Sequence, residues 1–141
     1  MSLCFLSLET SKVFNKLILE YLTSNGFDGL SDALIVLFPY LDEYEKLTAS
    51  QLSKKVGYTR QAMHKNIKKL EEFGYITLVQ ENQKEKIIQL TRKSEKLIIT
   101  ANQYISHIEN ELSIQIGKKE LEIYKDNQAK IYEYLNSISN S

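Results

Sequence analysis

The segment from Leu47 to Thr91 constrains the fold more than any other, because its pattern changes from helix to helix to hairpin within one short stretch. Thr48 and Gln51 have the Thr-x-x-Gln spacing of a capping box, so a short helix is expected to begin here. Gly57 is suited to end that helix in a left-handed conformation. Thr59 then opens a second helix, and two helices joined by a glycine turn predict a helix-turn-helix.

The second helix, expected over residues 59–70, has one apolar and one polar side. Met63, Ile67 and Leu70 recur at i, i+4 and i+7, which places them on one face. The rest of the surface offers cations and amide donors from Arg60, Gln61, His64, Lys65, Lys68 and Lys69. One side of this helix is therefore predicted to pack against a core, while the other is available to a partner.

A hairpin is expected directly after the second helix. Gly74 ends the helix, and Tyr75–Val79 is rich in the aromatic and β-branched residues that favour strands. Gln80–Glu85 contains no large apolar residue and forms a polar tip, after which Lys86–Leu90 returns as a second strand. Thr91 then caps a new helix. The order helix, turn, helix, hairpin predicts a winged helix-turn-helix.

These features resemble the MarR (multiple antibiotic resistance regulator) family of bacterial transcription factors. The residues that carry the resemblance are Leu47-Thr48, Gln51-Leu52, Thr59-Arg60, Leu70-Glu71, Gly74-Tyr75-Ile76 and Leu90-Thr91. The resemblance implies a mainly α-helical fold with a small β-hairpin wing, in which N- and C-terminal helices dimerise and the winged helix-turn-helix binds DNA.

The wing departs from the family pattern. In that family an Asp-x-Arg signature usually precedes the Leu-Thr pair, and the matching positions here are Asn82, Gln83 and Lys84. Lysine keeps a cation for a phosphate or minor-groove contact but lacks the two-pronged guanidinium of arginine. Ser94 stands where the family has a glycine soon after Leu-Thr. These differences bear on wing contacts more than on the fold.

Three regions of one compact domain are expected: N-terminal helices in residues 1–45, the winged helix-turn-helix in 46–93, and C-terminal helices in 94–141. The first helix spans about Leu6 to Ser24 and ends at Asn25-Gly26. Ser31 is expected to cap the second, which Pro39 should kink or shorten. Tyr44–Leu47 leads into the helix-turn-helix, where a short strand is expected to pair with the wing. Two long helices follow Thr91, with a break near Gly117.

The first and last helices carry more apolar surface than one winged helix can cover. The last two show helical spacing of Leu97, Ala101, Tyr104, Ile105, Ile108 and Leu112, then of Leu121, Tyr124, Ile131, Tyr132, Leu135 and Ile138. This surface favours a homodimer in which first and last helices interlock, as the resemblance also implies. An intrachain helical bundle is the alternative.

Charge is distributed unevenly although the net charge is zero. Between Lys46 and Lys93 the chain has eleven Lys and Arg against four Asp and Glu, and the remainder has seven against fourteen. A basic winged helix is what a nucleic-acid interface requires. A lysine-rich helix that is merely solvated is the alternative interpretation.

The expected partner is double-stranded DNA. Arg60, Gln61, His64 and Lys65 lie in the first turns of the second helix, where they could contact base edges. Phosphate contacts are expected from Lys68, Lys69, Lys84 and Lys86, with Thr59, Ser50 and Gln51 anchoring the backbone near helix N-termini. A dimer would read an inverted repeat whose half-sites lie roughly 34–36 Å apart.

Cys4 is the one residue that suggests redox chemistry. Its place near the start of the first helix is similar to that of the reactive cysteine in the organic-hydroperoxide regulators of the MarR family, and a helix N-terminus favours a thiolate. The resemblance fails at the tyrosines of that branch, whose positions are taken by Leu8, Ile18 and Gly29. A small, partly buried core cysteine is the alternative.

Other chemistry is not expected. Tyr21, Tyr40, Tyr44 and Tyr104 could line a cleft for a small aromatic or phenolic effector, as the family resemblance suggests, although core packing is the ordinary role of tyrosine. Neither His64 nor His107 has a Cys or His partner at metal-ligand spacing, and Glu109, Glu122 and Asp126 are typical of solvated helix surfaces, so no metal or cofactor is expected. No phosphate-binding glycine loop or nucleophile motif indicates an enzyme.

The sequence therefore predicts a cytoplasmic, homodimeric transcriptional regulator, most simply a repressor that a small-molecule effector releases from its operator. No stretch approaches the roughly 18 apolar residues of a membrane helix, and no signal peptide is expected at Met1–Leu8. One alternative keeps the fold and replaces the effector with oxidation of Cys4. Another, of a different class, is a winged helix that binds a protein partner instead of specific DNA.

Overall fold

The computed structural model describes residues 1–140 of the chain. These residues form two compact units, and the boundary between Asn102 and Gln103 falls inside one long helix. The division into residues 1–45, 46–93 and 94–141 stays a prediction.

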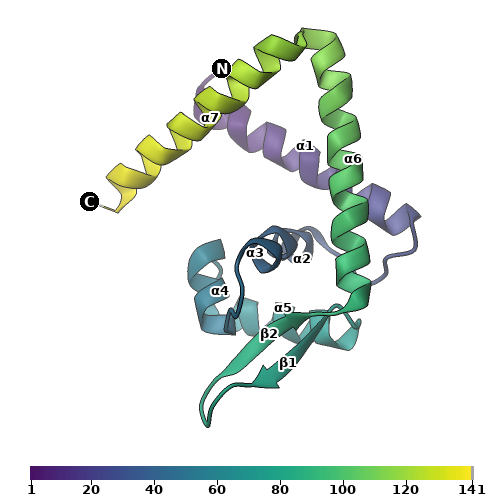
Figure 1. Ribbon diagram of the computed structural model, residues 1–141. Helices are drawn as coiled ribbons and strands as arrows, with labels where there is room; N and C mark the ends of the chain where they lie inside the picture. Colours follow the sequence, from purple (N-terminus) through teal and green to yellow (C-terminus); the bar gives the residue numbers. More distant parts are fainter. Residues whose placement is uncertain (141) are drawn as a thin grey trace. The chain divides into compact units, whose positions relative to one another are not determined.

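The first helix, α1, runs from Leu3 to Ser24 (Figure 1). It begins one turn earlier than the expected start at Leu6, because the Ser2 hydroxyl accepts a hydrogen bond from the Phe5 amide at 3.0 Å and caps the helix. Its end is as predicted: Gly26 has φ +88°, and the Phe27 amide donates to the Leu22 carbonyl at 3.1 Å. This pairing is that of a Schellman motif.

Pro39 divides the second predicted helix into two. α2 spans Asp32–Ile35, and its N-cap Ser31 accepts from the Leu34 amide at 3.3 Å. α3 spans Leu37–Glu43, so Pro39 lies in its first turn, where a backbone N–H has no partner within the helix. The predicted interruption by proline is confirmed.

The helix-turn-helix also forms as predicted. α4 (Ala49–Val56) has the full capping box: the Thr48 amide donates to Gln51 Oε1 at 3.0 Å, and the Gln51 amide donates to Thr48 Oγ1 at 3.1 Å. Gly57, at φ +85°, ends it. α5 (Arg60–Glu72) begins after Thr59, whose hydroxyl accepts from the Ala62 amide at 3.1 Å.

The wing is an antiparallel pair, β1 (Ile76–Gln80) and β2 (Lys86–Leu90). Before it, α5 ends in a second Schellman motif, in which Gly74 has φ +81° and the Tyr75 amide donates to the Leu70 carbonyl at 2.8 Å. The strand expected before the helix-turn-helix is reduced to one bridge, between Thr48 and Ile87, and the Ile88 amide donates to Leu47 at 2.8 Å.

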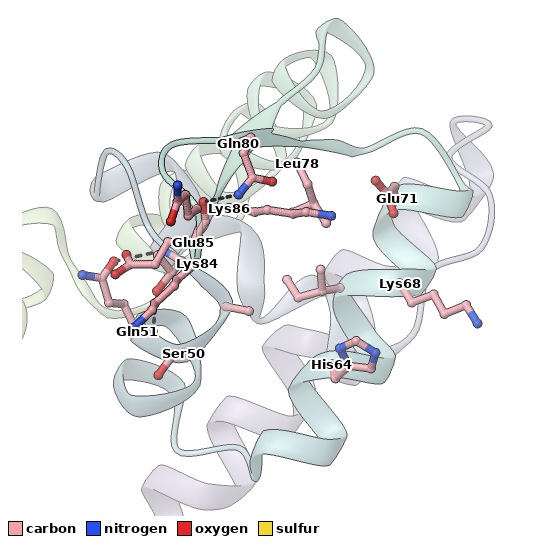
Figure 2. Close-up of a pocket in the computed structure, with 14 residues that line it drawn as sticks. Ser50, Gln51, His64, Lys68, Glu71, Leu78, Gln80, Lys84, Glu85 and Lys86 are labelled. Atoms are coloured by element: carbon pink, nitrogen blue, oxygen red, sulfur yellow. Dashed lines mark hydrogen bonds between the residues drawn. The ribbon is translucent and has the colours of Figure 1, made fainter.

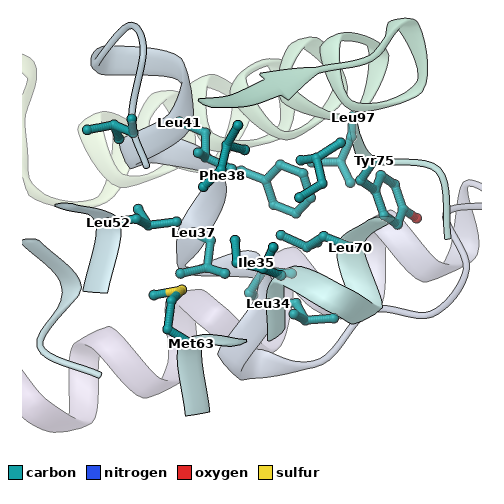
Figure 3. Packing of buried hydrophobic residues seen from close by; sticks show 14 of the residues in the cluster. Leu34, Ile35, Leu37, Phe38, Leu41, Leu52, Met63, Leu70, Tyr75 and Leu97 are labelled. Atoms are coloured by element: carbon teal, nitrogen blue, oxygen red, sulfur yellow. The ribbon is translucent and has the colours of Figure 1, made fainter. Parts of the chain in front are cut away.

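The core of the first unit lies between α2, α3, α4, α5 and the hairpin (Figure 3). The predicted apolar stripe of α5 is buried in it: Met63, Ile67 and Leu70 are 1%, 5% and 0% exposed. Tyr75 is also fully buried, with its ring edge-on to Phe38 at a centroid distance of 5.6 Å. This packing fixes which face of α5 points outward.

α6 spans Arg92–Ile116, and α7 spans Lys118–Ser139. Ser94, which stands where the MarR pattern has glycine, is fully buried at the start of α6. Its hydroxyl stabilises this end of the helix, because Oγ accepts a hydrogen bond from the Thr91 amide at 2.8 Å. Gly117 interrupts the helices as predicted, with φ +101° and ψ 138°, a conformation that glycine alone adopts readily. Among residues 1–140, no helix is both long enough and apolar enough to cross a membrane.

Gly29 is predicted to be the least replaceable glycine of the first unit. A Cβ here would lie 2.4 Å from the Phe73 ring at φ +71°, whereas at Gly26, with φ +88°, a Cβ would meet nothing within 4 Å. We expect Gly26→Ala to lower the free energy of unfolding by about 1 kcal/mol through backbone strain alone. Gly29→Ala should cost about 2–3 kcal/mol, because the ring must also move. Urea unfolding of both variants measures the difference, and equal losses would contradict the proposed packing of Phe73.

Candidate nucleic-acid interface

All six polar residues predicted to lie on the outward face of α5 are exposed there. Packing of the apolar stripe leaves this face exposed along the whole helix. The exposed residues are Arg60, Gln61, His64, Lys65, Lys68 and Lys69. Four of these six residues are lysine or arginine. Whether they contact DNA stays a prediction.

A groove of about 910 Å³ separates α5 from the wing (Figure 2). On one side lie His64, Lys68 and Glu71, which the i, i+4, i+7 spacing places in a line along α5. The opposite side is formed by the wing, and the start of α4 closes one end. The residues from these two elements are Thr48, Ala49, Ser50, Gln51, Leu78, Gln80, Gln83, Lys84, Glu85 and Lys86.

The groove brings together about half of the predicted DNA contacts. Ser50, Gln51, His64, Lys68, Lys84 and Lys86 line it. Thr59, Arg60, Gln61, Lys65 and Lys69 do not, although all five are exposed. The N-terminus of α4 also opens here, and the amides of a first helical turn attract anions. The arrangement can hold a strand of phosphates between the wing and α5.

Two carboxylates in the groove were not predicted from the sequence. Glu71 continues the line of His64 and Lys68, and Glu85 lies on the wing beside Lys84 and Lys86. The helical spacing of Glu71 was a readable signal, whereas the place of Glu85 depends on how the hairpin bends. The groove is therefore basic but mixed in charge, so a phosphate is favoured near the lysines and disfavoured near the two glutamates.

Two residues predicted to contact the DNA backbone, Gln51 and Thr59, also stabilise helix N-termini. The Gln51 side chain completes the capping box of α4 by accepting from the amide of the N-cap Thr48, and Thr59 is itself the N-cap of α5. Substituting either residue would destabilise a helix N-terminus, and loss of an N-cap lowers the free energy of unfolding by about 1 kcal/mol. A loss of DNA binding in such variants would not by itself demonstrate a DNA contact.

The wing tip is held by two amide side chains. Asn82 Oδ1 accepts from the amides of Lys84 and Glu85, both at 2.9 Å. Gln80 Nε2 donates to the carbonyls of Asn82 and Glu85 from inside the turn. Asparagine therefore makes the turn with the same acceptor that an aspartate would offer, without adding a negative charge beside Lys84.

The four tyrosines predicted to line an effector site have different surroundings. In the first unit, Tyr21 and Tyr44 are exposed and Tyr40 packs against the core, while Lys55 Nζ lies 3.9 Å from the centroid of the Tyr44 ring. Tyr104, in the second unit, lines a hollow of about 310 Å³ on α6. Their role in a ligand pocket stays a prediction.

Cys4 is exposed, in the first turn of α1. The alternative interpretation of a partly buried core cysteine is therefore wrong for this chain. Exposure in the first turn of a helix is compatible with a reactive thiol, and the redox role stays a prediction.

Glu109, two residues from His107 in the sequence, is paired with a lysine. Glu109 accepts from Lys125 at 2.7 Å, and this contact is the main reason why the pKa of Lys125 is raised. Within residues 1–140, no group of three or more His, Cys, Asp or Glu side chains is placed to hold a metal ion.

Comparison with known proteins defines the class. Residues 40–77, which include the helix-turn-helix and the start of β1, match a family model described as winged helix-turn-helix DNA-binding. No curated protein matches the chain. Many solved structures do.

Among the similar structures is a MarR family protein from Bacillus stearothermophilus, which is 17% identical with a TM-score of 0.79 over 95% of this chain and 93% of the other. The MepR–DNA complex of S. aureus is 20% identical with a TM-score of 0.74, covering 96% and 98%. FabT of Streptococcus pneumoniae in complex with DNA is 17% identical with a TM-score of 0.73, covering 97% and 99%. The chain thus has the fold of the MarR-type winged-helix proteins, and the predicted fold class is confirmed.

The wing turn offers a test that needs no DNA. In Asn82→Ala the amides of Lys84 and Glu85 lose their acceptor, so their hydrogen exchange should accelerate about fivefold, as expected for a hydrogen bond of about 1 kcal/mol. Asn82→Asp keeps the acceptor and is the matched control, with exchange near that of the wild type. Equal exchange in Asn82→Ala and the wild type would show that Asn82 does not hold the turn.

Proposed function

We propose that the chain is a sequence-specific DNA-binding transcriptional regulator that acts as a homodimer on an inverted-repeat operator. The observation that carries the proposal is the basic groove between α5 and the wing, next to a helix whose outward face is rich in cations and amides. The fold shared with MepR and FabT, both crystallised with DNA, supports it.

In the proposed complex, α5 enters the major groove with its N-terminal turns foremost. Arg60 and Lys65 can donate to guanine, and Gln61 to adenine. Lys68, Lys84 and Lys86 lie around the groove and would contact the phosphates of one strand, with Lys69 further along α5. Base contacts would set the sequence preference, and the lysines would supply most of the affinity.

Dimerisation would use the apolar side chains that each unit leaves exposed. On α1 these are Leu3, Phe5, Leu6, Leu8 and Val13. In the second unit they are Ile114, Ile116, Ile123, Tyr124, Tyr132, Tyr134, Leu135 and Ile138, and no residue of α7 is buried. Helices with this much exposed apolar surface favour association with another copy. A two-fold axis would then place two α5 helices roughly 34–36 Å apart, one turn of DNA.

Operator binding would be regulated by a shift in population between dimer conformations that fit the operator and conformations that do not. We propose repression relieved by a small aromatic or phenolic effector, in a cytoplasmic protein. Oxidation of Cys4 is the alternative trigger: in the single chain its thiol is exposed in the first turn of α1, next to side chains proposed to dimerise. Loss of operator binding after peroxide in the wild type, but not in Cys4→Ser, would single out the redox trigger.

Duplex binding at two salt concentrations tests the proposal, with the intergenic DNA upstream of the protein's own coding sequence as the target and a random duplex as competitor. We expect salt-sensitive, preferential binding by the wild type, lost in Arg60→Ala and Lys65→Ala. Lys68→Ala should keep the preference but lower the slope of log K against log salt by about two, since each dimer would lose two phosphate contacts.

The matched control is Lys16→Ala, which removes an exposed lysine of α1 that does not line the groove and should bind as the wild type does. Weak binding of equal strength to every duplex, unchanged by substitutions on α5, would overturn the proposal. It would favour the winged helix as a module for a protein partner.

A further inference from the structure

One ammonium group joins three parts of the first unit that are distant in sequence. Lys93 Nζ, at the start of α6, donates to Asp28 Oδ1 at 2.6 Å and to the Phe73 carbonyl at 2.6 Å. It also lies 4.4 Å from the centroid of the Tyr75 ring. Asp28 belongs to the turn after α1, and Phe73 is the C-cap of α5. The turn after α1, the C-terminal end of α5 and the start of α6 therefore meet at this lysine.

Neutral hydrogen bonds complete the same junction. The Tyr75 hydroxyl donates to the Asp28 carbonyl at 2.6 Å, and Thr91 Oγ1 donates to the Gly74 carbonyl at 2.7 Å. Burial, followed by the nearby charge of Asp28, raises the pKa of Tyr75 to about 12, so its hydroxyl remains a donor at any physiological pH. The hydrogen bond from Lys93 lowers the pKa of Asp28, which keeps that carboxylate charged.

Lys93 belongs to the basic segment of the chain, yet its contacts lie outside the lining of the groove between α5 and the wing. It is absent from the groove lining, and its ammonium is directed at a carboxylate, a carbonyl and an aromatic ring. A cation at the last carbonyls of α5 also complements the helix dipole. The charge thus acts on the orientation of α5 rather than on a phosphate.

A small change in the angle of α5 at its C-terminal end produces a larger displacement at its N-terminal end. α5 has 13 residues, and its proposed base-reading turns lie at the end opposite Phe73. At 1.5 Å per residue, a tilt of about 5° about the C-terminal end moves the N-terminal end by roughly 1.7 Å. Such a displacement is large compared with the tolerance of a hydrogen bond to a base edge.

We propose that Asp28 and Lys93 form a latch that ties the turn after α1 to the C-terminal end of α5 and holds α5 in its DNA-binding orientation. Both are positioning residues that act through α5 without touching DNA. The proposal rests on the proposed function, and it makes operator affinity depend on where the turn after α1 lies.

The direction in which Asp28→Asn changes DNA affinity separates a latch from a phosphate contact. Asp28→Asn breaks the ion pair and leaves the Lys93 cation in place. If Lys93 contacted phosphate, removing the nearby carboxylate would leave binding unchanged or tighten it. As part of a latch, Asp28→Asn should weaken binding to the upstream duplex by about three- to tenfold, and Lys93→Gln by a similar factor.

Three further readouts complete the binding experiment. The double variant should bind about as weakly as either single variant, because both remove one shared interaction. Lys93→Arg should restore binding, since a guanidinium can reach both acceptors. The salt slope should equal that of the wild type in Asp28→Asn and Lys93→Gln, because no phosphate contact is lost. A slope reduced only in Lys93→Gln, with Asp28→Asn unaffected, would overturn the latch.

Hydrogen exchange tests the latch independently of DNA. The amides of Phe73, Gly74 and Tyr75, which bond to carbonyls of α5, should exchange at least about threefold faster in Asp28→Asn than in the wild type. If the wild type prefers no duplex, the proposed function fails while this measurement still decides whether the latch exists. Unchanged exchange together with unchanged affinity would overturn the latch and leave the proposed function intact.

Discussion

Burial of one face of α5 is the interaction on which the rest of the structure depends. Met63, Ile67 and Leu70 pack into the core between α2, α3, α4 and the hairpin, and each such buried side chain contributes roughly 1.5–3 kcal/mol. The same packing turns the opposite face toward solvent, where the cations and amides lie. Stability and the proposed recognition are thus set by one helix, since its rotation about its own axis cannot change without exposing the stripe.

The ends of α5 are fixed as firmly as its middle. Thr59 caps the N-terminus, and the Schellman motif at Gly74 turns the chain directly into Tyr75, which is buried against Phe38. Lys93 joins this end to Asp28 in the turn after α1. An exposed ion pair of this kind adds little to global stability, so its place at a junction of three elements matters more than its energy.

Local signals predicted most of the fold. The capping box at Thr48, the glycine ends at Gly26 and Gly57, and the stripe of α5 each act within a few residues, so their outcome could be read from spacing. What the sequence did not reveal depends on distant contacts. The pairing of Asp28 with Lys93 and the closeness of Gly29 to the Phe73 ring join segments that meet only when the core has formed. Likewise, Glu71 and Glu85 share a groove only because the wing folds beside α5.

The proposed function requires that α5 and the wing of each subunit in a dimer bind DNA. Hydroxyl-radical footprinting of the protein on the DNA upstream of its coding sequence tests this requirement most directly. Two protected patches related by two-fold symmetry, with centres about one helical turn apart, are the predicted result. Uniform cleavage at protein concentrations that saturate binding, or a single patch without symmetry, would contradict it.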